Sequence, residues 1–208
     1  MCSNAVMNKV NDIYGPLAVT GRRRFLGALG AFAGTCMMSI QNAKAGFFYS
    51  TKPVAGIPQA WVNEKGSDVY RYANYIKGLR LKNVTPYMVL EPHFRSRGRT
   101  RNSLPPRYMW SRIAPTLRVI DAMASGMRAQ VSELLSIYRS PTYNRAVRGR
   151  SRSQHLENRA VDVRFKGVSA YTVSKVARSI RSQGKFAGGV GRYSSFTHVD
   201  TRGHNADW

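Results

Sequence analysis

The sequence predicts an α+β fold in which helices pack on one side of a small, mainly antiparallel sheet. Apolar side chains recur at helical spacing over 111–125, and apolar and polar side chains alternate over 160–165, as they do along a strand. Two further short strands are expected near 187–191 and 196–201, where they close the chain. Helices and short strands in this order are typical of an α+β domain.

The other elements are expected from local start and stop signals. Ser67 is a candidate N-cap, Gly126 is a candidate helix stop, and Pro141 is expected to begin a short helix. The stretch 91–107 combines proline, glycine and arginine, which predicts a basic loop. In chain order, the expected elements are an irregular lead over 46–66, a helix over 67–79, the basic loop, a helix over 111–125, a strand over 134–138, the helix from Pro141, a loop over 148–153, a strand over 160–165, a helix over 169–183 and the two final strands.

The first 45 residues have the order of an export signal. Three arginines over 22–24 precede a mostly apolar run over 27–40, and residues 43–45 offer a small-x-small cleavage site. The paired arginines followed by Phe and Leu resemble the twin-arginine export motif. The apolar run is shorter than the roughly 20 residues that span a bilayer, although a retained anchor and a lipoprotein anchor at Cys36 stay open. We therefore expect a twin-arginine-type signal over 1–45 and an exported protein, in the periplasm or cell envelope.

Charge and cysteine content limit the partners of the exported chain. The formal net charge is +23, from 33 basic and 10 acidic residues. Removal of residues 1–45 takes away five basic residues, one acidic residue, Cys2 and Cys36, so the mature chain keeps a charge of +19 and has no thiol for a disulfide or a metal. A positive surface attracts polyanions. The sequence has no zinc-finger spacing and no aromatic-basic platform, so we expect no specific binding to nucleic acid. Anionic wall polymers or lipid headgroups are the partners that fit an exported protein.

Two histidines and two aspartates form a pattern that suits a metal. In the strand over 160–165, alternation turns Asp162 to the face opposite the apolar side chains, and His155 lies seven residues earlier, where a loop can fold back. His198 and Asp200 share a face of the last strand because they lie two residues apart. Two His and one Asp are enough for a catalytic zinc site. On spacing alone, a hydrogen-bonded His and a solvated Asp are an open alternative.

Three separated motifs resemble the M15 peptidase family, in particular its branch of periplasmic murein endopeptidases. They are S-I-Y-R-S-P-T-Y-N over 136–144, S-Q-H-L-E-N-R-A-V-D over 153–162, and G-V-G-R-Y followed by H-V-D over 189–200. The resemblance covers about 108–208, which leaves 46–107 as an N-terminal extension with a helix and the basic loop. It implies a fold like that of hedgehog and DD-peptidases, with a zinc site on the sheet.

The resemblance also implies roles for single residues. His155, Asp162 and His198 fall on the zinc ligands of the family, with one Zn²⁺ per chain. Arg139 falls on an arginine that steadies the substrate carbonyl or carboxylate, and Ser153 and Tyr138 fall in motifs near the substrate. The implied activity is hydrolysis of peptidoglycan stem peptides or cross-links by a monomer. A D,D- or L,D-carboxypeptidase and a non-catalytic wall-binding protein are the alternatives.

Two positions depart from the family pattern. Asn158 stands where the family has Gly, and Asn tolerates the left-handed backbone that such a turn needs. Ser195 and Phe196 stand where relatives carry an acid or a histidine, so Asp200 is the remaining candidate for the general base. A structural salt bridge from Asp200 to Arg202 is the alternative role. Neither of the other two histidines, at 93 and 204, has a second ligand near it in sequence, and both are expected to be structural or solvated.

Overall fold

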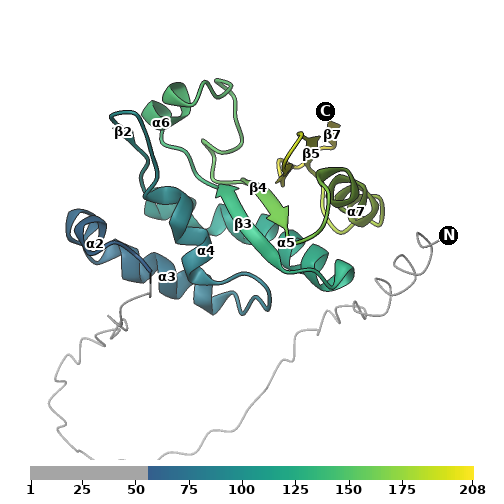
Figure 1. Cartoon of the computed structure of the whole chain (residues 1–208), viewed down its shortest axis with the longest axis horizontal. Helices are drawn as coiled ribbons and strands as arrows, with labels where there is room; N and C mark the ends of the chain where they lie inside the picture. Colours follow the sequence, from purple (N-terminus) through teal and green to yellow (C-terminus); the bar gives the residue numbers. More distant parts are fainter. Residues whose placement is uncertain (1–55) are drawn as a thin grey trace, which may run out of the picture. The chain divides into compact units, whose positions relative to one another are not determined.

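The computed structural model describes residues 56–208 (Figure 1). The expected export signal over 1–45, with Cys2 and Cys36, lies outside the described residues, and so do residues 46–55 of the expected lead. Within 56–208, no helix is long and apolar enough to cross a membrane.

The fold is α+β, as the sequence predicts. Five strands form one sheet in the order β3-β4-β6-β5-β7, and neighbouring strands are antiparallel except for the parallel pair β5 and β7. The strands are β3 (Val131–Ser136), β4 (Ala160–Phe165), β5 (Gly189–Arg192), β6 (Thr197–Asp200) and β7 (Ala206–Asp207). Helices α5 (Ala114–Met127) and α7 (Ala170–Ser182) pack against the sheet and against each other. Figure 1 shows both helices on the same side of β3 and β4.

Strand β4 lies inside the sheet, between β3 and β6, and divides its side chains between two faces. Val161, Val163 and Phe165 are buried in the hydrophobic core with the side chains of α5 and α7. Each such side chain contributes roughly 1.5–3 kcal/mol when it is fully buried. Because side chains alternate along a strand, Asp162 is left on the other face. Burial of the apolar side chains therefore decides where the candidate metal ligand points.

The N-terminal extension contains more regular structure than the sequence patterns predict. Helices α2 (Gln59–Lys65) and α4 (Pro86–Leu90) were not expected, and the lead over 46–66 is therefore not irregular throughout. The expected helix over 67–79 is α3 (Asp68–Gly78), although the Ser67 side chain makes no cap hydrogen bond. Short helices depend on tertiary contacts more than on intrinsic propensity. In α2 these contacts come from the buried side chains of Trp61 and Val62.

The region expected as a basic loop is partly ordered, and one helix end was placed wrongly. The loop region contains a short 3-10 turn, η2 (Glu91–His93), and a hairpin of β1 (Ser96–Arg97) and β2 (Thr100–Arg101). The 3-10 helix η3 (Arg107–Ile113) leads into α5. Helix α5 continues through Gly126 and ends at Met127, and the C-cap residue Arg128 has a φ of 52°, in the left-handed region. A single Gly inside a helix costs only about 1 kcal/mol, so it does not stop a helix that packs well.

Residues on both sides of position 108 belong to one hydrophobic core. Ile76 and Leu90 from the extension lie in the same buried cluster as Leu117 and Val199. A polar contact adds to this packing, because the Asn83 backbone and side-chain amides donate to Asp121 Oδ1 at 2.6 and 3.1 Å. The extension therefore helps to support the sheet that carries the candidate site.

Candidate metal centre

The structure brings His155, Asp162 and His198 together, and we call these three residues the ligand trio. Strands β4 and β6 pair with Asp162 opposite His198, and the loop before β4 carries His155. One ligand atom from each residue lies within 4.8 Å of the others, and all three residues are buried. Register between two strands thus unites residues that are 36 positions apart in the chain.

Each nitrogen of the two imidazole rings of the trio lies within 3.2 Å of an oxygen atom. His155 Nδ1 lies 2.5 Å from the Ile137 carbonyl oxygen, and because a carbonyl can only accept, Nδ1 carries the hydrogen. The other nitrogen, Nε2, faces Asp162 Oδ2 at 3.2 Å. His198 Nδ1 lies 2.8 Å from Asp162 Oδ1, and His198 Nε2 lies 3.0 Å from Asp200 Oδ2. Each ring therefore directs one nitrogen at Asp162.

The electrostatics of the trio follow from burial opposed by mutual contacts. Burial raises the pKa of Asp162, but His155 and His198 outweigh burial and hold this pKa below its ordinary value. Burial lowers the pKa of His155, and Asp162 opposes this only in part. For His198, contacts with Asp162 and Asp200 overcome burial and raise the pKa. The carboxylate of the trio is therefore ionised, and His155 favours its neutral form.

The donor chemistry of the trio fits a cation. A neutral His155 with its hydrogen on Nδ1 presents an Nε2 lone pair to an ionised carboxylate 3.2 Å away, and two electron-rich atoms repel each other at this distance. A metal ion between them removes this conflict. Two imidazole nitrogens and one carboxylate oxygen form a set typical of catalytic zinc. The outer nitrogens bond to Ile137 and Asp200, as metal-binding histidines usually bond to a carbonyl or carboxylate.

Arg139 lies beside the trio, as the sequence motif suggests. Its NH2 group donates to Asp162 Oδ2 at 2.7 Å, and its Nε donates to Ser136 Oγ at 2.7 Å. The side chain is 18% exposed, so the guanidinium can be reached from solvent while its direction is held. Its backbone N–H donates to the His155 carbonyl at 3.1 Å, which joins the two motifs directly.

Ser153 and Tyr138, which the sequence places near the substrate, have structural contacts. Ser153 Oγ accepts from the His155 backbone N–H at 3.4 Å and so supports the turn that carries this ligand. Tyr138 is only 5% exposed, and burial raises the pKa of its phenol. Asn158 has a φ of 52°, the left-handed conformation for which Asn is suited. A role of Ser153 or Tyr138 in substrate binding stays a prediction.

Asp200 is fully buried, and its carboxylate accepts hydrogen bonds from several donors. The Arg202 guanidinium binds both carboxylate oxygens at 2.8 and 2.5 Å, and the Gly189 backbone N–H donates to Oδ1 at 3.0 Å. Burial raises the pKa of Asp200, but Arg202 and His198 outweigh it and lower the pKa overall. The salt bridge that we considered as the alternative role is therefore present. The assignment of Asp200 as general base stays a prediction, and these contacts favour a role in orienting His198.

Two residues near the metal centre, Asn102 and Trp208, were not predicted from the sequence. Asn102 is buried in the former loop region, where its amide donates to the Tyr138 carbonyl at 2.9 Å and its carbonyl accepts from the Ser140 backbone at 3.0 Å. It thereby clamps the turn on both sides of Arg139. Trp208 packs its ring 5.1 Å from that of His198 and remains 45% exposed. A side chain at Gly191 would collide with this indole, so the glycine is needed for Trp208 to pack at this position.

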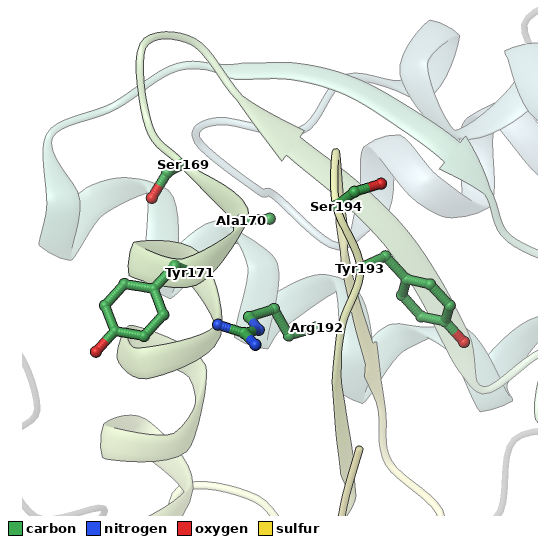
Figure 2. Close-up of a pocket in the computed structure, with 6 residues that line it drawn as sticks. All are labelled: Ser169, Ala170, Tyr171, Arg192, Tyr193 and Ser194. Atoms are coloured by element: carbon green, nitrogen blue, oxygen red, sulfur yellow. The ribbon is translucent and has the colours of Figure 1, made fainter.

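An open pocket lies away from the ligand trio, between the first turn of α7 and the β5–β6 turn (Figure 2). Figure 2 shows Arg192 pointing toward Tyr171, and its guanidinium carbon lies 5.7 Å from the centre of that ring. Tyr193 points in the other direction. None of the residues that the sequence assigns to the site lines this pocket.

Comparison with known proteins places the trio within a matched region. The sequence profile of the family described as peptidase M15 matches residues 98–200, which include the ligand trio, Arg139 and Asp200. Over 83 residues the chain is 39% identical to the probable peptidoglycan L,D-endopeptidase MepK of Haemophilus influenzae, a match of 36% of this chain and 42% of that protein. The chain thus covers less than half of the length of this relative. No solved structure matches this chain significantly. Through residues 98–200, the chain belongs to the M15 peptidase family.

Proposed function

We propose that this protein is an exported, zinc-dependent peptidase that hydrolyses the stem peptides or cross-links of peptidoglycan. The observation that carries the proposal is the ligand trio, in which two imidazole nitrogens and a carboxylate oxygen lie within 4.8 Å of one another. Membership of the M15 family supports peptidase chemistry. The name of the Haemophilus influenzae relative supports peptidoglycan as the substrate and endopeptidase as the activity.

His155, Asp162 and His198 would hold one zinc ion. When bound, zinc supplies Lewis acidity toward a peptide carbonyl and toward water. Arg139 uses Nε and NH2 on Ser136 and Asp162, which leaves NH1 without a partner among the described residues. A guanidinium directed in this way can bind a substrate carboxylate or the oxygen on which charge develops. The contribution of Arg139 is therefore to position the substrate over the trio.

Asp200 is proposed to orient His198. Its Oδ2 accepts from His198 Nε2, which leaves the hydrogen on Nε2 and the lone pair of Nδ1 directed at the metal position beside Asp162. Arg202 and the Gly189 backbone hold the carboxylate in this place. Partners of this kind fix the tautomer and the ring orientation of a metal-binding histidine.

The same contacts favour one rival, a wall-binding protein that retains the fold without turnover. Asp200 has no exposed surface and both of its oxygens are bonded, so it is poorly placed to take a proton from water. All the other acidic residues over 56–208, apart from Asp162 of the trio, are occupied elsewhere: Asp121 is bound by Asn83, and the rest form ion pairs with Lys or Arg. A carboxypeptidase is the second rival, since it would use the same zinc ligands.

Digestion of purified sacculi tests the proposal. Protein that lacks residues 1–45 and carries one equivalent of zinc is incubated with sacculi, and the released products are identified by mass. Cleaved cross-links with intact terminal residues support an endopeptidase, and release of single terminal amino acids indicates a carboxypeptidase. Binding to sacculi without any product, by zinc-loaded protein, would support the non-catalytic rival.

The proposed location is tested separately. Twin-arginine recognition reads the guanidinium pair, so replacing Arg22, Arg23 and Arg24 by Lys should retain the precursor in the cytoplasm although the charge is unchanged. Fractionation followed by detection of the precursor and the mature form measures this. Normal processing of the triple variant would assign export to another route and would leave the peptidase proposal intact.

A further inference from the structure

Six exposed arginines lie on two segments that adjoin the metal centre, and we call them the arginine face. None of the six has an ion-pair partner among residues 56–208. They are Arg97, Arg99, Arg145, Arg148, Arg150 and Arg152. The stretches 92–120 and 134–156, which carry all six, contain no acidic residue, so an ion-pair partner would have to come from another segment.

The two segments of the arginine face are packed together. The hairpin of β1 and β2 contacts α6 (Pro141–Ala146), and Figure 1 shows them side by side. Helix α6 begins two residues after Arg139, and the loop that follows it ends at His155. Asn102, directly after β2, donates to the Tyr138 carbonyl and accepts from the Ser140 backbone. The arginine face is therefore continuous with the residues that form the site.

The loop over 147–152 presents its arginines from a defined backbone. Asn144 is 3% exposed and donates its side-chain amide to the Arg150 carbonyl at 3.0 Å. The Gly149 backbone N–H donates to the Asn144 carbonyl at 2.8 Å, and a side chain at Gly149 would collide with the Asn144 amide. Arg148 has a φ of 55°, which a non-glycine residue adopts only when its surroundings require it. The face is thus a formed surface.

Several other arginines of the described chain pair with carboxylates, although the exposed Arg80, Arg118 and Arg128 have no ion pair among residues 56–208. Arg95, Arg101, Arg107, Arg112 and Arg164 each pair with a carboxylate outside the ligand trio. Six like charges on adjoining segments repel one another, and a polyanion removes this cost. Between positions 83 and 165 the basic residues are all arginine, whose planar fork binds carboxylates in two-point contacts.

We propose that the arginine face binds the uncleaved, carboxylate-bearing peptides of peptidoglycan next to the bond that lies at the metal centre. This inference rests on the proposed function for the identity of the polymer. Because the face is continuous with the site, a polymer held by Arg139 and the trio can extend over it, and the six unpaired guanidinium groups favour a polymer that carries carboxylates. Its role is to retain the polymer, while the trio and Arg139 act on one bond.

Sedimentation of metal-free protein with purified sacculi, at low and high salt, tests binding without turnover. One variant replaces Arg97, Arg99, Arg148, Arg150 and Arg152 by Gln. The matched control removes five charges from exposed residues outside the face, by replacing Lys77, Arg80, Lys82, Arg128 and Lys166 with Gln. Both variants must keep the Tm and the zinc capacity of the parent. Sacculi whose carboxylates have been amidated, and vesicles of anionic phospholipid, are the other two probes.

We expect the face variant to bind sacculi on the order of tenfold more weakly, because each exposed charge pair contributes between about 1.4-fold and fivefold. The control should change binding by less than about threefold, and amidated sacculi should bind the parent protein as weakly as untreated sacculi bind the face variant. Equal losses in both variants, or no loss in either, would overturn the inference. Loss of vesicle binding with sacculus binding retained would assign the face to a membrane and also overturn it. Parent protein that binds through the face but releases no product would contradict the proposed function alone.

Discussion

The structure buries histidines in two different surroundings. His93 lies in the helical extension with its ring edge-on to Tyr72 at 5.8 Å, and neither of its nitrogens has a hydrogen-bond partner of good geometry. His155 and His198 are also buried, but each of their nitrogens faces a carbonyl or a carboxylate. Burial is the same in both places, and the partners differ.

This difference decides what each histidine can do. Burial lowers the pKa of His93 to about 4, which nearby backbone carbonyls of Val89 and Leu90 oppose only weakly, so the ring is a neutral part of the core. At the metal centre, Asp162 and Asp200 raise the pKa of His198 despite burial. A buried histidine becomes a candidate ligand when the fold places a carboxylate against one nitrogen and an orienting acceptor against the other.

The largest expected effect is on zinc content, which should depend on His155 and His198 but not on His93. The parent protein should bind about one zinc per chain, since it offers one set of three ligands. His155→Ala or His198→Ala should abolish this binding, whereas His93→Ala should retain it and lose stability. Elemental analysis after dialysis, with unfolding curves for all three variants, measures both effects. Full zinc occupancy in the double variant of His155 and His198 would refute the ligand assignment.

The Asp200→Asn variant tests whether Asp200 orients His198 or acts as the general base. If Asp200 orients His198, zinc affinity should fall about 10- to 100-fold, and the free energy of unfolding should fall by about 1–3 kcal/mol because Arg202 loses its charged partner. If Asp200 is instead the base, zinc affinity should be unchanged while turnover falls by about 10²-fold or more. Competition with a chelator, thermal unfolding and sacculus digestion, done on one preparation, distinguish these results.

The pH dependence of stability tests the surroundings of His93. Its pKa is lowered to about 4 in the folded state, against about 6.5 when unfolded, so the unfolded chain takes up the proton first as the pH falls. The contribution of the neutral ring is complete above about pH 6.5 and is lost as the pH falls toward 4, by on the order of 2–3 kcal/mol. His93→Leu should remove this slope. Denaturant unfolding of the zinc-loaded protein at several pH values measures it, and parallel curves for parent and variant would contradict the prediction.

The smallest expected effect concerns the aromatic side chain that covers His198. Trp208 is 45% exposed, so Trp208→Ala should lower the free energy of unfolding by less than about 1 kcal/mol and zinc affinity by less than about tenfold, since the indole makes no hydrogen bond to the ligand. Trp208→Phe is the control that keeps a ring over Gly191. Calorimetry and chelator competition give both values. A loss of zinc as large as that in His198→Ala would show that the indole is essential to the site.

The prediction of the fold was most accurate where one segment carries its own pattern. The strand over 160–165 and the helices near 67–79 and 169–183 were placed within about two residues of their observed bounds. The strand expected over 134–138 lies at Val131–Ser136, because Ile137 leaves the sheet and turns its carbonyl to His155. Helices α2 and α4 were missed since five to seven residues are too few to show a helical period.

Asp162 and His198 were selected on spacing, alternation and a family motif, and their meeting required the antiparallel register of β4 and β6. Spacing along one strand places His198 and Asp200 on the same face, which left Asp200 open as a base or a structural partner. The tertiary structure forms the salt bridge to Arg202, which the sequence offered as the alternative, and adds a hydrogen bond from the Gly189 backbone in β5 that no local pattern encodes. The residue types and their order along the chain thus determined which side chains could bind a metal, because alternation depends only on neighbours in sequence. Which nitrogen faces the metal position, and which carboxylate is buried behind it, depends on strand pairing between distant segments and was decided by the fold alone.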